Sequence, residues 1–361
     1  MFGLFKKAKT EQNAKIMPSG DTITVKAGDN LLKGALEAGL HWPHDCRVGS
    51  CGTCRCILKE GQVKELSDFA YVLDQKELQS GMILACQAVL RSDVVIEVEL
   101  LKDIDQSVNV SSHEGVIHKV TPLTHDIVEL VVKASDDFPR TALAGQYAEI
   151  SVDDIDQPRS YSFARAPENE NDKELTFFVR RVPGGEFTEW LFAEDRSGKP
   201  MVVTGPYGSF WLRTGDAPIV CVAGGSGMAP IKALLESAHN SDTERDVLFL
   251  FGARTQKDLY CQDVMEQLQK KWKGKFEFVP VLSEEPEDSG WNGACGMVTD
   301  YLQQAYIDTG KADMSVSQGY LCGPPPMIDA TLAMLAAAGM AKDDIHFDKF
   351  LDASSMPAGR K

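Results

Sequence analysis

The sequence predicts a multidomain chain in which a small α+β domain precedes an antiparallel β-barrel or sandwich and then a doubly wound α/β domain. The chain has 361 residues, which is too long for one ordinary hydrophobic core. Residues 115–208 have the pattern of short strands separated by Pro, Gly and Asp turns, which is typical of an antiparallel barrel or sandwich. From Pro218 onward strand and helix patterns alternate, and this rhythm predicts a parallel, doubly wound sheet.

The elements of the first domain follow from hydrophobic periodicity. Residues 21–27 alternate and predict a strand, whereas residues 31–39 carry apolar side chains at helical spacing and end at Gly39. Further along we expect a strand at 55–58, a turn at 60–61, a helical region at 74–79 and a strand at 94–100. The polar stretch that follows, residues 103–113, predicts a linker.

The elements of the two later domains follow one another in regular succession. The expected strands of the barrel or sandwich are 115–123, 127–134, 145–152, 159–165, 175–182 and 201–208. In the α/β domain the expected strands are 218–224, 246–254, 276–283 and 318–323, and the expected helices are 228–240, 258–272, 296–306 and 325–339.

Composition excludes some classes of function. The net charge of −16 argues against nucleic acid as a partner, because binding it requires a basic face. The longest uncharged stretch, residues 217–231, is broken by glycine and proline and does not predict a membrane span. The N-terminus MFGLFKKAK lacks the apolar core of a signal peptide, so we expect a cytoplasmic protein. In that reducing compartment nine cysteines do not imply disulfides.

The stretch HDCRVGSCGTCRC predicts an iron–sulfur site. Cys46, Cys51 and Cys54 have the spacing C-x4-C-x2-C, and Cys86 follows in the apolar segment ILACQ. This spacing matches the plant-type 2Fe–2S pattern. Zinc normally takes its cysteines as two close pairs, which the sequence does not offer, although zinc and an accidental spacing remain alternatives.

Cys56 competes with Cys86 for the fourth ligand position. It follows Cys54 by two residues, where the chain enters an expected strand, so it should leave the loop and pack as a small buried side chain. Gly49 and Gly52 allow the backbone to turn tightly around inorganic sulfur. We therefore expect Cys46, Cys51, Cys54 and Cys86 to be the metal ligands.

Two stretches in the second domain suit a flavin. In PRSYSFA, Tyr161 offers a ring to stack, Ser162 a hydroxyl and Arg159 a cation for a phosphate. About twenty residues later Gly184 and Gly185 precede Thr188 and an expected helix, where free amides favour an anion. Each pattern alone is weak, because such residues also pack in strands and form ordinary glycine turns.

The third domain carries a glycine-rich loop between a strand and a helix. Gly224, Gly225 and Gly227 would let a dinucleotide pyrophosphate approach the backbone, although Pro230 stands where the strict fingerprint has its last glycine. At the end of the second strand Arg254 favours a ribose phosphate and Asp258 favours an unmodified ribose. The residues themselves leave the choice between NADPH and NADH open.

The combination of CRVGSCGTCRC with ILACQ resembles plant-type ferredoxin domains fused to flavin reductases. These are the NAD(P)H-dependent reductase components of bacterial oxygenases and hydroxylases, within the ferredoxin–NADP reductase-like superfamily. The resemblance covers essentially the whole chain. It implies a β-grasp ferredoxin domain at 1–102, a linker at 103–113, a β-barrel flavin domain at 114–214 and a nicotinamide domain at 215–361.

The resemblance also implies roles for individual residues. In that family R-x-Y-S and G-G-x-x-T/S hold the flavin and its pyrophosphate, and the domain order favours FAD over FMN. A C-terminal aromatic residue covers the flavin, which nominates Phe350, with Phe347 as its rival. The Cys-Gly-Pro of LCGPPPM lies beside the nicotinamide, which nominates Cys322 and Gly323 as binding residues. Ser162 and Cys322 are the expected catalytic residues, and GAR-T-x-x-D-L resembles NADH-using reductases, with NADPH as the alternative.

The function that follows is electron transfer. We expect hydride transfer from NADH to the flavin, and then single electrons through the cluster to a separate metal protein. The resemblance implies a Rieske oxygenase, a soluble di-iron monooxygenase or a membrane-bound hydroxylase as the partner of a monomeric reductase. The alternatives are a non-oxygenase acceptor, such as a deoxysugar-forming dehydratase, and a redox sensor.

Overall fold

The computed structural model describes residues 11–102, 109–135, 144–166 and 173–350. The chain divides into two compact units, one with residues 1–110 and 207–209 and the other with residues 111–206 and 210–361. Each unit is built around its own hydrophobic cores. In the part of the chain that the structure describes, no helix is long and apolar enough to cross a membrane.

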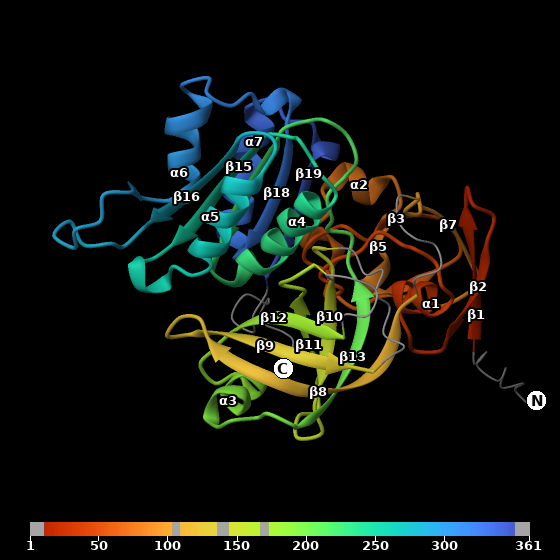
Figure 1. Cartoon of the computed structure of the whole chain (residues 1–361). Coiled ribbons are helices and arrows are strands. Elements are labelled where there is room, and N and C mark those ends of the chain that lie inside the picture. Colours follow the sequence, from red (N-terminus) through yellow and green to blue (C-terminus); the bar gives the residue numbers. More distant parts are fainter. Residues whose placement is uncertain (1–10, 103–108, 136–143, 167–172, 351–361) are drawn as a thin grey trace, which may run out of the picture. The chain divides into compact units, whose positions relative to one another are not determined.

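A five-stranded mixed sheet with the order β2-β1-β7-β3-β5 forms the centre of the first unit (Figure 1). Helix α1 (Leu31–Glu37) lies directly on β2, since a Cβ on Gly34 would meet Val25 Cγ2 at 2.7 Å. The strands are β1 (Glu11–Met17), β2 (Thr22–Lys26), β3 (Arg55–Glu60), β4 (Val63–Glu65), β5 (Met82–Leu84), β6 (Ala88–Leu90) and β7 (Val94–Glu97). The short helices are η1 (Phe69–Tyr71), α2 (Gln75–Gln79) and η2 (Ala85–Gln87).

The periodicity did not predict β1. This strand is mostly polar, and within EQNAKIM only Ala14 and Ile16 are buried. It pairs in parallel with β7, which supplies the partner that a local pattern does not show. The expected strand after the cysteines does begin at Arg55, so residues 44–54 form an irregular loop between α1 and β3.

The flavin-type domain is an antiparallel barrel, as the resemblance implies. Its six strands have the order β11-β10-β13-β8-β9-β12, and a bridge between Phe163 and Phe177 brings the two edges together. Strand β8 begins at Ser111, inside the range expected for the linker. The elements are β8 (Ser111–Pro122), β9 (Ile127–Ala134), β10 (Tyr147–Ser151), β11 (Arg159–Ser162), β12 (Glu174–Arg180), α3 (Glu186–Ala193) and β13 (Pro200–Tyr207).

The last domain is a doubly wound parallel sheet with the order β17-β16-β15-β14-β18-β19. Alternate residues of β14 enter two different cores, one shared with α4 and α5 and the other with α6 and α7. The strands are β14 (Ile219–Gly224), β15 (Val247–Ala253), β16 (Phe276–Leu282), β17 (Ala294–Cys295), β18 (Gln318–Gly323) and β19 (Ile345–Lys349). The helices are η3 (Gly225–Gly227), α4 (Met228–Asn240), η4 (Gln256–Asp258), α5 (Gln262–Lys271), α6 (Val298–Leu302), η5 (Gln303–Ile307), η6 (Met314–Val316), α7 (Pro325–Ala337) and η7 (Lys342–Asp344).

Helix α5 and strand β19 both differ from expectation. Helix α5 begins at Gln262 and not at Asp258, because Cys261 adopts a left-handed backbone with φ of 57° that separates η4 from α5. Strand β19 was not predicted, although it pairs in parallel with β18. Its sequence IHFDK places a charged residue, Asp348, at a buried position.

Candidate functional site

The structure brings four cysteines of the first unit together as two pairs. A hydrogen bond joins the side chains of Cys46 and Cys51, and another joins those of Cys54 and Cys86. The hydrogen bond from Cys51 lowers the pKa of the Cys46 thiol to about 5, and the hydrogen bond from Cys54 lowers the pKa of Cys86. Four sulfur ligands in two pairs are what the two irons of a 2Fe–2S cluster require, so the donor set fits that group.

The backbone around these cysteines is arranged to donate hydrogen bonds to sulfur. The amides of Ser50 and Cys51 both lie 3.4 Å from Cys46 Sγ, and the amide of Thr53 lies 3.5 Å from Cys51 Sγ. The Gln87 side chain donates to Cys86 Sγ at 3.5 Å. Such donors stabilise thiolates and tune the potential of a bound cluster.

Gly49 and Gly52 of the cysteine loop have backbone conformations that favour glycine, and neighbouring side chains leave no room for a Cβ atom. Gly49 and Gly52 have φ values of 77° and 76°, which favour glycine. A Cβ on Gly49 would meet Gln87 Cγ at 2.5 Å, and one on Gly52 would meet Val72 Cγ1 at 2.9 Å. The loop is therefore packed tightly against its own domain.

Cys56 lies apart from the two pairs. Its thiol donates to the carbonyl of Ile83 at 3.9 Å, and the residue is 3% exposed within the domain core. Burial raises the pKa of this thiol, which disfavours the thiolate that a metal needs. These contacts support Cys86 over Cys56 as the fourth ligand.

Residues 207–209 pack against the start of the cysteine loop inside the same compact unit. The Ser209 amide donates to Asp45 Oδ1 at 2.8 Å, and the Arg47 guanidinium lies 4.1 Å from the centre of the Tyr207 ring. Sequence reasoning did not find these contacts, because the two segments are 164 positions apart.

The predicted flavin residues of β11 and α3 are close to one another. Arg159 donates to Glu186 Oε2 at 3.2 Å, which links the strand to the first turn of the helix. The Tyr161 ring packs against Phe187 with centroids 5.5 Å apart. The fold therefore brings the two weak sequence patterns, R-x-Y-S and the glycine turn, close together.

The glycine turn before α3 is held by Thr188. Its hydroxyl donates to the Val182 carbonyl and accepts from the Val182 amide, both at 3.1 Å. Gly184 has a φ of 73°, and a Cβ on Gly185 would meet Thr188 Oγ1 at 2.8 Å. In this structure Thr188 shapes the turn, and the Gly185 amide also donates to the Val182 carbonyl at 2.8 Å.

A carboxylate that sequence reasoning missed connects the two expected catalytic residues. Ser162 Oγ donates to Asp348 Oδ2 at 3.2 Å, and Asp348 is 9% exposed. Asp348 on β19 is also the register partner of Cys322 on β18. The sequence signal was weak: an acidic residue between two phenylalanines in the segment HFDKF, whose pattern does not predict a strand.

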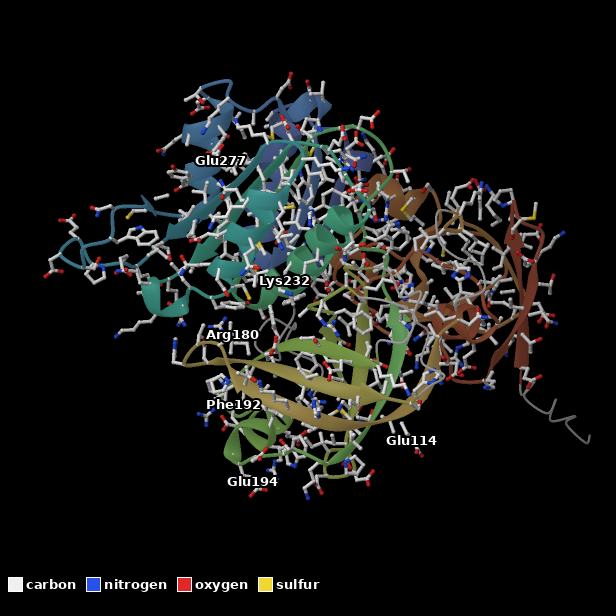
Figure 2. The ribbon with its side chains drawn as sticks, in the orientation of Figure 1. Glu114, Arg180, Phe192, Glu194, Lys232 and Glu277 are labelled. Atoms are coloured by element: carbon white, nitrogen blue, oxygen red, sulfur yellow. The ribbon has the colours of Figure 1, made fainter. Side chains whose placement is uncertain are left out.

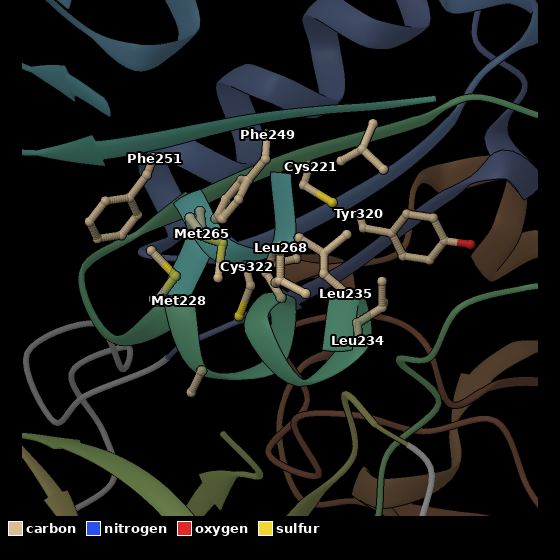
Figure 3. Close-up of a cluster of buried hydrophobic side chains, with 14 of the residues drawn as sticks. Cys221, Met228, Leu234, Leu235, Phe249, Phe251, Met265, Leu268, Tyr320 and Cys322 are labelled. Atoms are coloured by element: carbon tan, nitrogen blue, oxygen red, sulfur yellow. The ribbon is translucent and has the colours of Figure 1, made fainter. Parts of the chain in front are cut away.

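The thiol of Cys322 lies in a hydrophobic core. The residue is fully buried with Cys221, Met228 and Met265, and burial raises its pKa (Figure 3). This environment disfavours an ionised thiol. The structure therefore supports a packing role for the Cys322 side chain, which fixes the position of the backbone at the end of β18.

A buried lysine joins the barrel to the doubly wound domain within the second unit. Lys232 on α4 donates to the Ala164 carbonyl at 3.0 Å and pairs with Glu236 at 2.7 Å (Figure 2). Ala164 follows the R-x-Y-S strand, and α4 follows the glycine loop. The two predicted cofactor segments are thus tied to each other by one side chain.

The glycine loops at the ends of β14 and β18 are in direct contact. A Cβ on Gly227 would lie 2.2 Å from the Cys322 carbonyl oxygen, and one on Gly323 would lie 3.0 Å from the Gly224 oxygen. Gly225 has a φ of 57°. The two loops pack backbone against backbone at the carboxyl ends of adjacent strands, which is where doubly wound sheets bind nucleotides.

Replacing Gly227 with alanine is expected to weaken NADH binding and to destabilise the protein. The added methyl group would overlap backbone atoms of Cys322, so the two strand ends must separate at a cost of about 1–3 kcal/mol. Thermal unfolding and the KM for NADH measure the two effects. The matched variant Gly225→Ala meets no backbone, only Arg180 at 3.8 Å, and should cost about 1 kcal/mol for its left-handed φ. A larger loss of stability in Gly225→Ala than in Gly227→Ala would contradict this assignment.

Phe350 and Phe347 take different positions. The Phe350 amide donates to the Gly323 carbonyl at 2.9 Å, and its side chain is half-buried beside the core that contains Cys322. Phe347 packs into the opposite core with α7. Phe350 is therefore on the side of the sheet that carries Cys322, which supports it as the aromatic cover.

Family models match three successive segments of the chain. Residues 14–91 match the 2Fe-2S iron-sulfur cluster binding domain, residues 114–211 the oxidoreductase FAD-binding domain, and residues 221–332 the oxidoreductase NAD-binding domain. The chain thus carries domains for a 2Fe–2S cluster, FAD and a nicotinamide dinucleotide.

Relatives of known function match over nearly their whole length. The electron transfer component XylA of xylene/toluene monooxygenase from Pseudomonas putida is 43% identical over 94% of this chain and 94% of its own. The reductase component DmpP of phenol 2-monooxygenase from Pseudomonas sp. (strain CF600) is 34% identical over 95% of each chain.

Solved structures of similar reductases share the fold. The ferredoxin reductase in carbazole 1,9a-dioxygenase superposes with a TM-score of 0.72 at 30% identity, and covers 94% of this chain and 98% of its own. The Amycolatopsis cytochrome P450 reductase GcoB gives a TM-score of 0.79 at 30% identity with the same coverage.

Proposed function

The chain belongs to the family of NAD(P)H-dependent reductases that join a 2Fe–2S ferredoxin domain to FAD- and NAD-binding domains, and on this premise we propose that it delivers electrons from NADH to the terminal component of an aromatic-hydrocarbon monooxygenase. The observation that carries this proposal is the 43% identity, over 94% of both chains, to the electron transfer component of xylene/toluene monooxygenase.

The residues of the site suit that chain of transfers. When bound, the nicotinamide supplies a hydride, the flavin divides its electron pair, and the cluster carries single electrons. Cys46, Cys51, Cys54 and Cys86 hold the cluster. The barrel residues Arg159, Tyr161, Ser162, Gly184, Gly185 and Thr188, with Phe350, form the flavin site, and Gly224, Gly225, Gly227, Cys322 and Gly323 form the nicotinamide site.

The nature of the partner is also a proposal. Relatives include components of monooxygenases that act on xylene, toluene, phenol and propane, and of dioxygenases. The highest identity among these relatives, 43%, favours a hydroxylase for small aromatic hydrocarbons as the partner. The proposal includes a membrane-bound hydroxylase of that kind. We propose that the reductase itself works as a monomer in the cytoplasm, where NADH is supplied and cysteines stay reduced.

Anaerobic addition of NADH to the purified protein is expected to bleach both its flavin and its cluster absorbance bands. A colourless protein that contains zinc would refute the electron chain. The partner is tested separately, by combining the reduced protein with the hydroxylase component of a toluene monooxygenase and measuring toluene oxidation. Turnover with an unrelated dioxygenase but not with that hydroxylase would contradict the proposed partner while leaving the electron chain intact.

A further inference from the structure

Gln87 directly follows the last cysteine of the cluster site, and its side chain is buried beside that cysteine. Gln87 is 3% exposed and Cys86 is 2% exposed. The side-chain amide of Gln87 donates to Cys86 Sγ at 3.5 Å and to the Cys86 carbonyl oxygen at 2.9 Å. A glutamine side chain therefore contacts one sulfur atom of the expected ligand set.

The orientation of this amide is fixed from both ends. The Cys86 carbonyl can only accept a hydrogen bond, so the nitrogen of the Gln87 side chain must face it and the oxygen must point away. Ser67 Oγ donates to that oxygen at 3.1 Å. An amide rotated by half a turn would lose the Cys86 carbonyl as an acceptor, so the donor to sulfur is held in one orientation.

The position of Ser67 is in turn set by the backbone. The Leu66 amide donates to the Gln87 carbonyl oxygen at 2.8 Å, next to the antiparallel pairing of β4 with β6, in which Glu65 is the partner of Ala88. The hydroxyl that anchors the amide therefore belongs to a segment that is hydrogen-bonded to the main chain of Gln87 itself.

Gly49 leaves the space that the Gln87 side chain fills. A Cβ on Gly49 would lie 2.5 Å from Gln87 Cγ, 2.9 Å from Gln87 Cδ and 3.3 Å from Ser67 Oγ. Any larger residue at this position would displace the amide and its anchor. The glycine of the cysteine loop and the residue after Cys86 are therefore packed as one unit.

Gln87 differs from the other donors to sulfur described above, because those donors are the backbone amides of Ser50, Cys51 and Thr53. The fold of the loop places a backbone amide, whereas a single substitution removes the donor of Gln87 without changing any residue of the loop. Since Gln87 and Cys86 are both buried, water does not compete for this hydrogen bond, which strengthens it.

We propose that Gln87, held by Ser67, raises the reduction potential of the 2Fe–2S cluster through its hydrogen bond to Cys86, and so helps the cluster to accept electrons from the flavin. This inference rests on the proposed function as an electron-transfer reductase and deepens it. It assigns part of the driving force for the transfer to a positioning residue outside the set of ligands.

The sign of the effect follows from charge. Reduction by one electron adds negative charge to the cluster and its thiolate ligands, and an N–H donor stabilises the more negative state more strongly. Removal of the donor therefore destabilises the reduced state and lowers the potential. We expect the equilibrium constant for reduction to fall about tenfold, which corresponds to about 59 mV for one electron.

The test is a redox titration of the purified, cluster-loaded protein with dithionite, followed by electron paramagnetic resonance of the reduced cluster. Gln87→Met keeps the length and the unbranched shape of the side chain and removes its donor. Its potential should lie about 59 mV below that of the unmodified protein, as a tenfold change requires. Gln79→Met replaces an exposed glutamine at the end of α2 in the same unit and should leave the potential unchanged.

Ser67→Ala is the second variant, and it leaves Gln87 in place. It removes the anchor of the amide oxygen while the Cys86 carbonyl still holds the nitrogen, so the potential should fall by less than in Gln87→Met. The double variant should show the shift of Gln87→Met alone, because Ser67 acts through the amide. Resonance Raman spectra of the oxidised cluster measure the same contact, since Fe–S stretching frequencies should change in Gln87→Met and stay constant in Gln79→Met.

Two results would overturn the inference. One is an unchanged potential in Gln87→Met, and the other is a double variant whose shift exceeds that of Gln87→Met. If Gln87→Met does not assemble a cluster, Ser67→Ala decides, and an unchanged potential there overturns the inference as well. A failure of the proposed function is distinguishable, because it would appear as no reduction of the unmodified protein by NADH, whereas dithionite reduces the cluster without NADH.

Discussion

Replacing Cys86 with serine is expected to abolish the 2Fe–2S cluster, whereas replacing Cys56 with serine is expected to leave it in place. Cys86 shares a hydrogen bond with Cys54 and completes the second pair of sulfur ligands. Cys56 instead contacts the Ile83 carbonyl in the domain core. Iron content and visible absorbance measure the cluster directly. NADH-dependent reduction of cytochrome c should fall to background in Cys86→Ser, while reduction of ferricyanide by the flavin should persist.

Cys56→Ser can lower the stability of the protein, and Cys56→Ala is the control for that effect. A serine hydroxyl at a position that is 3% exposed should cost about 1–2 kcal/mol of stability, although the Ile83 carbonyl remains as an acceptor. Cys56→Ala avoids the buried hydroxyl and should also keep the cluster. The opposite result, with iron retained in Cys86→Ser and lost in both Cys56 variants, would establish Cys46, Cys51, Cys54 and Cys56 as a local quartet.

The cysteine site was predictable because its chemistry depends on short spacings. Three ligands lie within nine residues, and the loop glycines mark its tight turns. The glycine loop of the nicotinamide domain was predictable for a similar reason, although it lacks the strict fingerprint. Pro230 replaces the last glycine without harm because it is the third residue of α4, within the first turn, where the amide has no intrahelical acceptor.

The ion pair between Arg254 and Asp258 joins the end of β15 to η4. The two residues are four positions apart, but Thr255 between them is extended, with a φ of −139°, so the helical spacing rule does not predict their contact. Treating them as competing signals for NADPH and NADH overlooked that they neutralise each other. Asp126 also pairs with Arg254 and was out of reach, because it lies 128 positions from Arg254 and in another domain.

The contact between Asp348 and Ser162 could not be predicted from the sequence either. It lies 186 positions from Ser162, and β19 is too short and too mixed in polarity for its pattern to predict a strand. Only the parallel pairing of β19 with β18 places this carboxylate beside Cys322. Residues that act through such long-range contacts have no local pattern that a single sequence could reveal.

Replacing Asp348 with asparagine is expected to slow the reduction of the flavin by NADH on the order of 100-fold, the usual effect of removing one positioned polar group from a reacting centre. Asp348 accepts the hydrogen bond of Ser162, so it fixes the orientation of the hydroxyl that we propose to lie in the flavin site. Stopped-flow absorbance under anaerobic conditions measures this step. We expect the limiting rate to fall with little change in the apparent affinity for NADH, because the glycine loops that bind the dinucleotide are unaltered.

Two further variants separate this positioning role from a purely structural one. Ser162→Ala should slow the same step, and the double variant should be no slower than the more impaired single variant, since both act through one hydrogen bond. Asp329→Asn removes an exposed carboxylate that pairs with Lys349, the neighbour of Asp348, and should leave the rate unchanged. If Asp348→Asn instead lowers only the unfolding temperature and keeps the rate, the carboxylate serves packing alone. If the Ser162 and Asp348 effects multiply, the two residues act independently and their hydrogen bond does not carry the effect.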